Sequence, residues 1–267
     1  MTDVLAVTGL TAGYGKVPIV SDVTFRVGLS KVVTIVGPNG AGKSTALKAT
    51  FGLVNRFGGA IHLDGEAVTE LPTHALAWAG MGYVPQVDNV FATMTVQENL
   101  SLGGLVQPSR AKKRDVERRN EVFDIFPDLA LARTKKAGQL SGGQRNMLGM
   151  ARALMSEPKV MLLDEPTAGL SPANVDVVWS QIRRIADLGT SILVVEQNVA
   201  RALRQADWVY VLVAGGNYLD GSAATLQSVD LGAIFLGATH PDGAHRIGDG
   251  DSDELQNQVP HHQPQQQ

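Results

Sequence analysis

The stretch VVTIVGPNGAGKSTALKATFGL, residues 32–53, decides the fold of this chain. Residues 32–36 are all valine, isoleucine or threonine, which predicts a short strand buried on both faces. Residues 37–44 fit the pattern G-x-x-x-x-G-K-[ST] at every fixed position, and residues 45–53 predict a helix. A strand, a glycine-rich loop and a helix in this order form a loop whose backbone N–H groups bind phosphates.

Each part of this phosphate loop has an expected role. The glycines let the backbone turn its N–H groups inward, Lys43 reaches the terminal phosphates, and the Ser44 hydroxyl binds Mg²⁺. The alternative is a glycine-rich turn with a chance Lys-Ser pair, and the flanking strand and helix argue against it. The residues expected to contact the nucleotide are Gly37, Pro38, Asn39, Gly40, Ala41, Gly42, Lys43, Ser44 and Thr45.

A pair of acids follows the apolar run MLL in the stretch 161–165. Parallel sheets present ligand-binding groups at the carboxyl ends of their strands, so we expect Asp164 to hold Mg²⁺ through water. Glu165 is then free to polarise the water that attacks the γ-phosphate, because phosphoryl transfer needs a positioned nucleophile. A helix N-cap followed by an acidic first turn would look similar, and the phosphate loop upstream favours the catalytic interpretation.

The remaining strand signals predict an α/β fold. Continuous apolar runs indicate strands of a mostly parallel sheet covered by helices, whereas alternating runs near the N-terminus indicate a smaller antiparallel sheet beside it. The continuous runs are residues 32–36, 160–163, 191–195 and 208–213, and the alternating runs are residues 5–10, 22–27 and 60–65.

No strand signal is present between residues 87 and 140, and residues 110–126 predict a helix. We therefore expect a helical subdomain inserted into an α/β domain that spans residues 1–237. The tail, residues 238–267, has too few apolar residues to offset the entropy of ordering, so we expect it to be disordered. Mixed charges in residues 110–119 predict a solvated helix face, and contact with lipid headgroups or partner acids is the alternative.

The composition excludes several classes of function. A net charge of −3 does not suit a surface that neutralises phosphates, so we expect no nucleic-acid partner. The chain has no cysteine, which leaves oxygen-bound metals as the expected kind. Its N-terminus lacks a basic region followed by an apolar core, and its apolar runs are too short to span a bilayer, so we expect a cytoplasmic protein.

The stretch 140–172, LSGGQRNMLGMARALMSEPKVMLLDEPTAGLSP, resembles the signature segment of the ABC ATPases. Together with the phosphate loop, this resemblance covers roughly residues 4–236. It implies that the chain binds ATP and Mg²⁺ and hydrolyses ATP to drive transport. In this family the signature of one subunit closes over the ATP held by another, which assigns Ser141, Gly142, Gly143 and Gln144 to a partner's nucleotide. Physically, Ser141 and the glycines begin a helix whose N-terminus can meet a phosphate.

The resemblance assigns two more residues. Tyr14 matches the aromatic residue that stacks on adenine, although an aromatic beside a glycine turn can also serve packing alone. Gln86 matches the loop glutamine that contacts Mg²⁺ and water. The family uses this region, with residues 94–100 nearby, to hold a cytoplasmic helix of the permease.

The chain departs from the common family pattern at two positions. Gln197 stands where many members have a histidine that contacts the γ-phosphate, and glutamine cannot carry a titrating proton. We therefore expect Gln197 to act in catalysis without a histidine-like pH dependence of hydrolysis near neutrality. Ser171 replaces the usual aspartate that helps to join the subunits, which leaves communication between the two sites open.

Three segments, residues 166–172, 195–198 and 235–238, resemble ATPase subunits of branched-chain amino acid importers and of urea or short-chain amide importers. This implies import of a small polar solute through a separate permease at the cytoplasmic face of the membrane. It also implies a second ATPase subunit, with a heterodimer favoured over a homodimer, and indirectly a substrate-binding protein.

Two other classes of function remain as alternatives. One is a non-transport ABC ATPase that acts on DNA or ribosomes, which usually has paired ATPase domains or a long coiled coil. This chain has one phosphate loop, and residues 87–140 are too few for such an arm. The other is a regulatory subunit that binds ATP but hardly hydrolyses it, and the presence of Glu165 argues against it.

Overall fold

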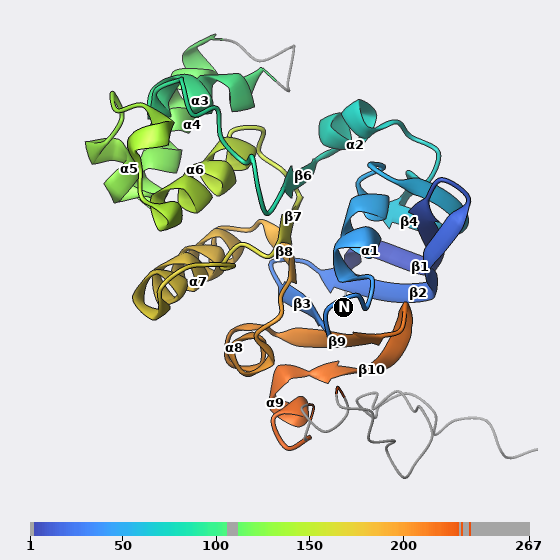
Figure 1. The fold of residues 1–267 in the computed structure, drawn as a ribbon. Helices are drawn as coiled ribbons and strands as arrows, with labels where there is room; N and C mark the ends of the chain where they lie inside the picture. Colours follow the sequence, from blue (N-terminus) through green and yellow to red (C-terminus); the bar gives the residue numbers. More distant parts are fainter. Residues whose placement is uncertain (1–2, 106–111, 230, 232–234, 236–267) are drawn as a thin grey trace, which may run out of the picture.

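The computed structural model describes residues 3–105, 112–229, 231 and 235. Two sheets and the helices around them make up the fold (Figure 1). The smaller sheet has the order β2-β1-β4-β5 and is antiparallel. Its strands are β1 (Asp3–Tyr14), β2 (Val17–Gly28), β4 (Asn55–Leu63) and β5 (Glu66–Ala67).

The larger sheet has the order β10-β9-β3-β8-β7-β6 and is mostly parallel. Among the described strands of this larger sheet, only β10 runs antiparallel to its neighbour, β9. The prediction of an α/β fold with an antiparallel N-terminal sheet and a mostly parallel main sheet is therefore confirmed. The strands are β3 (Val32–Val36), β6 (Met81–Val84), β7 (Val160–Asp164), β8 (Ser191–Val195), β9 (Trp208–Val213) and β10 (Gly216–Ser222).

The continuous apolar runs form the central strands because both faces of the main sheet are covered. Every residue of β3, β7 and β8 is buried. Side chains alternate between the faces of a strand, so Val160 and Leu162 pack with the antiparallel sheet and α1 (Lys43–Thr50). Met161 and Leu163 pack on the opposite face, in the same cluster as Trp179. Burial on both faces thus fixes the position of the loops that follow these strands.

A group of helices lies between β6 and β7 in the chain, apart from the antiparallel sheet (Figure 1). A capping box begins α3, in which the Thr95 hydroxyl accepts from the Glu98 N–H and the Glu98 carboxylate accepts from the Thr95 N–H. The helices of this group are α3 (Val96–Gly104), α4 (Lys112–Ile125), α5 (Pro127–Leu131), the 3₁₀ helix η1 (Ala137–Gln139) and α6 (Gly142–Leu154).

The predicted domain limits concern the helical insertion and the C-terminal tail. The limits 87 and 140 for the helical insertion stay a prediction, although helices fill most of this range. The predicted tail, residues 238–267, lies outside the described residues.

The other helices are α2 (Thr73–Ala79), α7 (Pro172–Asp187), α8 (Val199–Gln205) and α9 (Ala223–Leu226). Within the described ranges, none of the helices is both long and apolar enough to cross a membrane.

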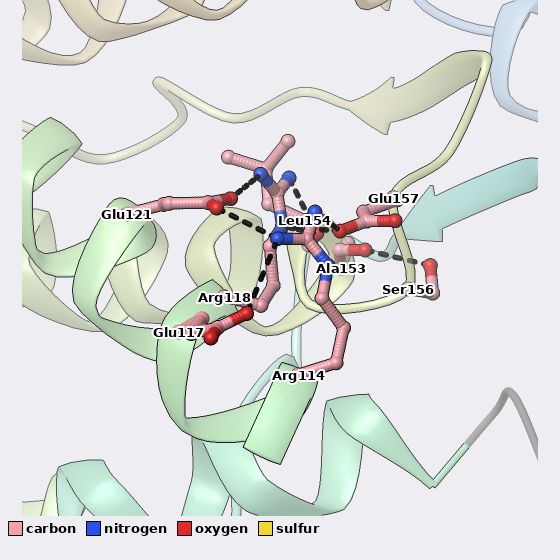
Figure 2. Close-up of polar contacts among 8 residues, drawn as sticks. All are labelled: Arg114, Glu117, Arg118, Glu121, Ala153, Leu154, Ser156 and Glu157. Atoms are coloured by element: carbon pink, nitrogen blue, oxygen red, sulfur yellow. Dashed lines mark hydrogen bonds and ion pairs between the residues drawn. The ribbon is translucent and has the colours of Figure 1, made fainter. Parts of the chain in front are cut away.

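The C-terminal end of α6 is held by charged side chains of α4 (Figure 2). Arg118 donates through Nε and Nη2 to the Leu154 carbonyl oxygen, at 3.0 and 2.8 Å. Arg118 and Arg114 also bind the two carboxylate oxygens of Glu121, each at 2.9 Å, and Arg114 reaches Glu157 just beyond α6. A guanidinium at the last carbonyls of a helix satisfies an acceptor without an intrahelical partner and opposes the negative end of the helix dipole. These contacts fix α6 to α4.

Candidate nucleotide-hydrolysing site

The phosphate loop joins β3 to α1 and needs glycine at two positions. A Cβ atom added at Gly37 would lie 2.1 Å from the carbonyl oxygen of Leu212 in β9. Gly42 has φ +89° and ends the loop, and a Cβ atom there would lie 2.4 Å from Cγ1 of Val20 in β2. Backbone conformation and close approach therefore both require glycine, and the loop is held between the main sheet and the β1-β2 hairpin.

Lys43 is the first residue of α1, and its side chain folds back over the phosphate loop. Its Nζ donates to the carbonyl oxygens of Gly37 and Pro38 at 2.9 and 3.0 Å. The residue is only 5% exposed, and burial lowers the pKa of its amine, which the carboxylates of Glu165 and Asp164 oppose. The loop therefore holds a buried ammonium group near two carboxylates. Its positive charge favours the binding of a strongly negative group at this position.

Asp164 is the last residue of β7 and is 3% exposed. Its Oδ1 accepts from the Ser44 hydroxyl at 2.6 Å, and its Oδ2 lies 3.9 Å from Nζ of Lys48 in α1. A hydroxyl and a carboxylate in direct contact are a fitting pair of oxygen donors for Mg²⁺, which prefers such ligands and keeps part of its water shell. The structure thus brings together the two residues whose types suggested a metal site, and their role as ligands stays a prediction.

Glu165 follows β7 in the left-handed backbone region, with φ +47°. This conformation is uncommon for a residue with a side chain and costs about 1–2 kcal/mol. Nε2 of Gln197 donates to both carboxylate oxygens at 2.8 and 2.7 Å, and Nε2 of Gln86 donates to Oε2 at 2.9 Å. Two loops, which follow β8 and β6, thus orient the acid that is expected to polarise water.

This arrangement refines the expected roles of the two glutamines. The sequence predicts Gln86 at the metal and Gln197 at the γ-phosphate, whereas the structure places the amide nitrogen of each on Glu165. Both expected roles stay predictions, and they require the amide groups to leave Glu165 or to use their oxygen atoms. The phosphate loop, Gln86, Glu165 and Gln197 follow the ends of β3, β6, β7 and β8, respectively. They nevertheless converge at one edge of the main sheet, because parallel strands end at the same edge.

Glu196 is a further acid in the site that no sequence motif indicated. Glu196 directly follows β8, is 4% exposed, and accepts from the Thr167 hydroxyl at 2.7 Å and from the Gln197 N–H at 3.3 Å. Burial raises the pKa of its carboxyl, and these hydrogen bonds oppose the rise. It ties the loop after β7 to the loop after β8. An acid directly after a buried strand, as at Asp164, was the signal that could have found it.

Tyr83 of β6 is a second residue of the site that no sequence motif indicated. Its hydroxyl donates to Oδ2 of Asp164 at 3.3 Å, and its ring stacks on Phe51 with the centroids 5.4 Å apart and the planes at 19°. Burial, followed by the charge of Asp164, raises the pKa of the hydroxyl well above its ordinary value. The hydroxyl is therefore protonated at physiological pH and acts as a donor to the carboxylate.

Tyr14 ends β1 and is 52% exposed. It pairs with Val17 at the tip of the β1-β2 hairpin, the same hairpin that passes beside Gly42 at Val20. Exposure of the ring is what stacking on a purine base requires. The adenine contact of Tyr14 stays a prediction, and its position on this hairpin agrees with it.

The signature residues begin α6 and form a second capping box. The Ser141 hydroxyl accepts from the Gln144 N–H at 3.2 Å, and the Gln144 side chain accepts from the Ser141 N–H at 3.1 Å. Gly143 is buried against Asn174 of α7. Figure 1 shows α6 in the helical group and α1 on the other side of β6 and β7. The helix that the signature begins therefore lies apart from the helix that follows the phosphate loop, and the contact of the signature with a partner's nucleotide stays a prediction.

Two asparagines connect α6 to the nucleotide loops of its own chain. Asn146 donates to the carbonyl oxygen of Pro166, directly after Glu165, at 2.7 Å, and accepts from Nδ2 of Asn89 at 3.0 Å. Asn89 lies in the segment that follows Gln86. α6 is therefore linked directly to the loop after β7, which carries Glu165, and to the segment after β6, which carries Gln86. Ser171, the other departure from the family pattern, is the N-cap residue of α7 without a side-chain capping hydrogen bond.

A phosphate-binding loop, a buried lysine and paired acids at the end of a parallel strand together define a nucleotide-hydrolysing enzyme of the phosphate-loop class. Comparison with known proteins gives the family. Residues 20–168 match the ABC transporter family, ABC_tran. A nucleotide-free ATP-binding cassette from an ABC transporter matches the structure with a TM-score of 0.78 and 25% sequence identity, covering 88% of this chain and 100% of that one.

Curated relatives from several organisms are also named as ATP-binding proteins of transport or export systems. A probable branched-chain amino acid transport ATP-binding protein, LivF of Archaeoglobus fulgidus, is 43% identical over 81% of this chain and 91% of its own length. BraG of Pseudomonas aeruginosa, a high-affinity branched-chain amino acid transport ATP-binding protein, is 37% identical over 84% and 95%. LptB of Haemophilus influenzae, a lipopolysaccharide export system ATP-binding protein, is 34% identical over 88% and 97%.

The chain belongs to the ABC transporter family. It is the ATP-binding subunit of an ABC transporter and hydrolyses ATP for transport. ABC ATPase subunits act together with membrane permease subunits, which confirms the predicted class of partner. The match to this family also favours a role in transport over the alternative of an ABC ATPase that acts on DNA or ribosomes.

Proposed function

We propose that this subunit drives the import of branched-chain amino acids from the cytoplasmic face of the membrane. The observation that carries this proposal is the 43% identity to LivF, a level that the relatives named for lipopolysaccharide export do not reach. The segments 166–172 and 195–198 point to the same subfamily. Cargo specificity lies in other subunits, because no residue of the nucleotide site reads the transported molecule.

The experiment is uptake of radiolabelled leucine by cells that lack this subunit. We expect uptake to fall to background and to return with the wild-type chain. A chain with a defect in ATP binding, Lys43→Ala, should not restore it. Leucine uptake that continues unchanged in the deletion strain would contradict the proposal.

Export of lipopolysaccharide is the second candidate function, favoured by the 34% identity to LptB. The same deletion strain separates the two functions. Loss of lipopolysaccharide from the outer surface together with normal leucine uptake would assign the chain to export, whereas the opposite pattern supports import.

The working form that we propose is a head-to-tail pair of ATPase subunits. Within one chain α6, which begins after Ser141, lies on the other side of β6 and β7 from α1 (Figure 1), so we expect its N-terminus to meet the ATP of a partner. ATP then joins the subunits and its hydrolysis releases them. By resemblance to branched-chain importers we expect the partner to be a different ATPase, which makes a heterodimer.

Replacing the signature serine tests this arrangement. Ser141→Ala removes both the helix cap and the hydroxyl expected at the partner's γ-phosphate. Losing a hydrogen bond to a charged group costs about 1.5–3 kcal/mol, so the turnover of the paired subunits should fall roughly 10- to 100-fold. ATPase activity and light scattering with a nonhydrolysable ATP analogue measure turnover and pairing.

The matched control is Thr95→Ala, which removes the capping box of α3. Both variants should lose about 1 kcal/mol of unfolding free energy, because each loses one N-cap hydroxyl. Only Ser141→Ala should lose pairing and turnover. Equal activity of the two variants would remove Ser141 from the proposed interface.

The metal is also part of the proposal. We infer that Mg²⁺ binds at Ser44 and Asp164, with Gln86 as the third residue that the family assigns to it. Ser44 and Asp164 would hold the ion, which would supply charge neutralisation to the phosphates, while Glu165 accepts the proton of the attacking water. Lys43 and the phosphate-loop N–H groups hold the triphosphate, and Gln197 orients Glu165.

A cavity of about 340 Å³ between β6 and α6 is the place where we propose that the permease docks. The guanidinium of Arg152 lies over the ring of Phe91, 5.1 Å from its centroid, and burial lowers its pKa. Among the described residues no carboxylate pairs with it, so a permease segment with apolar side chains and one carboxylate would complement the cavity. The lining includes Phe51, Tyr83, Phe91, Leu102, Arg152 and Ala153.

A further inference from the structure

Tyr83 is the one residue that both lines this cavity and contacts a proposed metal ligand, within the described ranges. Its ring forms part of the cavity wall and stacks on Phe51, which also lines the cavity and caps the C-terminal end of α1. Its hydroxyl lies on the other side, at Asp164. The two ends of a single rigid side chain therefore belong to two different sites.

The contacts of Asp164 show why this hydroxyl matters for metal binding. The short bond from Ser44, at 2.6 Å, holds Oδ1, whereas Oδ2 is held by Tyr83 at 3.3 Å and approached by Lys48 at 3.9 Å. The Tyr83 bond is long for a hydroxyl donor and is the weaker of the two. The Ser44 hydroxyl can donate its proton to Oδ1 and still use its lone pairs on a cation. Tyr83 is the neutral donor that orients the other oxygen, Oδ2.

We propose that Tyr83 is a positioning residue for Asp164, and that through its ring a partner bound in the cavity alters how this carboxylate is held. The proposal rests on the proposed metal site at Ser44 and Asp164. It adds a route from cavity to site that does not pass through Gln86. Hydrogen-bonded partners of metal-ligating carboxylates typically change metal affinity about 10- to 100-fold when they are removed.

The test is the effect of Mg²⁺ on nucleotide affinity in the purified chain. The dissociation constant of a fluorescent ATP analogue is measured in Mg²⁺ and in EDTA, and their ratio reports how much the metal contributes. Tyr83→Phe keeps the ring and removes the hydroxyl. We expect it to lower this ratio about 10-fold, the small end of the range because the bond is long, and to leave the affinity in EDTA unchanged.

The matched control is Tyr210→Phe in β9. Tyr210 is a buried tyrosine of the main sheet, whereas Tyr83 is partly buried. The Tyr210 hydroxyl accepts a hydrogen bond from the Arg26 N–H at 3.1 Å. Burial raises its pKa to about 12, so its hydroxyl is also protonated at physiological pH. This variant should leave the ratio unchanged. A ratio that Tyr83→Phe does not change, or an equal loss of affinity in Mg²⁺ and EDTA, would overturn the positioning role.

The absence of any Mg²⁺ effect in the wild-type chain would instead contradict the metal site itself. That result is distinct from a failure of the Tyr83 proposal, which concerns only the difference between variant and wild type. The uptake experiment with leucine is independent of both results.

The link to the cavity is tested by a double-mutant cycle with Phe51→Leu. We expect Phe51→Leu to lower the Mg²⁺ ratio by about 3-fold through the loss of its stacked ring, and to have no further effect in the Tyr83→Phe background. Effects of neighbours that act through one group are not additive. If Phe51→Leu alone leaves the ratio unchanged, or keeps its full effect in the double variant, then the cavity does not act on Asp164 through Tyr83.

Discussion

Replacement of Glu165 by glutamine is expected to lower the ATPase rate about 10²- to 10⁴-fold, the usual contribution of a general base. Glutamine keeps the shape of the side chain but cannot take a proton from the attacking water. Binding of ATP should stay within about 3-fold of wild type, because Lys43 and the phosphate loop supply most of the contacts. Paired subunits should therefore accumulate with ATP bound.

Phosphate release and the nucleotide content of the isolated complex measure these two effects. Glu66→Gln is a suitable control, because Glu66 is an exposed carboxylate on β5. The amide of residue 165 would offer a single oxygen to the donors of Gln86 and Gln197, so a melting curve should accompany the rates. Turnover close to that of wild type would show that Glu165 is not the base.

Lys43→Ala should weaken ATP binding roughly 10- to 100-fold. A hydrogen bond to a charged group contributes about 1.5–3 kcal/mol, and every 1.4 kcal/mol is a factor of ten in affinity. Removal of the lysine also takes away a buried cation that opposes the charges of Asp164, Glu165 and Glu196. Repulsion between the triphosphate and these acids then adds to the loss.

Equilibrium titration with a fluorescent ATP analogue measures the affinity. Lys159→Ala provides the control, since Lys159 is half exposed and pairs with Asp64 at the surface. It should bind ATP as wild type does. An affinity of Lys43→Ala equal to that of this control would mean that the folded-back position of Lys43 over Gly37 and Pro38 is its only role.

The parts of the fold that could be predicted from the sequence are those fixed by local patterns. Residues 32–36, 160–163 and 191–195 are apolar without alternation because both faces of these strands are covered, so the runs predict the parallel sheet directly. The glycine spacing of the phosphate loop is likewise a local requirement, seen in the close approach of Gly37 to Leu212. Such features need no knowledge of distant residues.

The contacts within the site could not be predicted in the same way. The amides of Gln86 and Gln197 converge on Glu165 only because β6, β7 and β8 stand side by side, an order that the chain sequence does not state. The sequence pattern gave no role to Tyr83, because its hydroxyl bond to Asp164 depends on the register between β6 and β7. The roles of both glutamines at the nucleotide stay predictions.

The two hydrogen bonds from Arg118 to the carbonyl oxygen at the end of α6 have a practical consequence for following the catalytic cycle. Because α4 binds one end of this helix and Ser141 begins the other, we expect α4 and α6 to move together as one rigid unit. A fluorophore attached to the outer surface of α4 would then report the location of the signature without touching it. Energy transfer to a second dye beside the phosphate loop could time the opening and closing of the transporter during each round of transport.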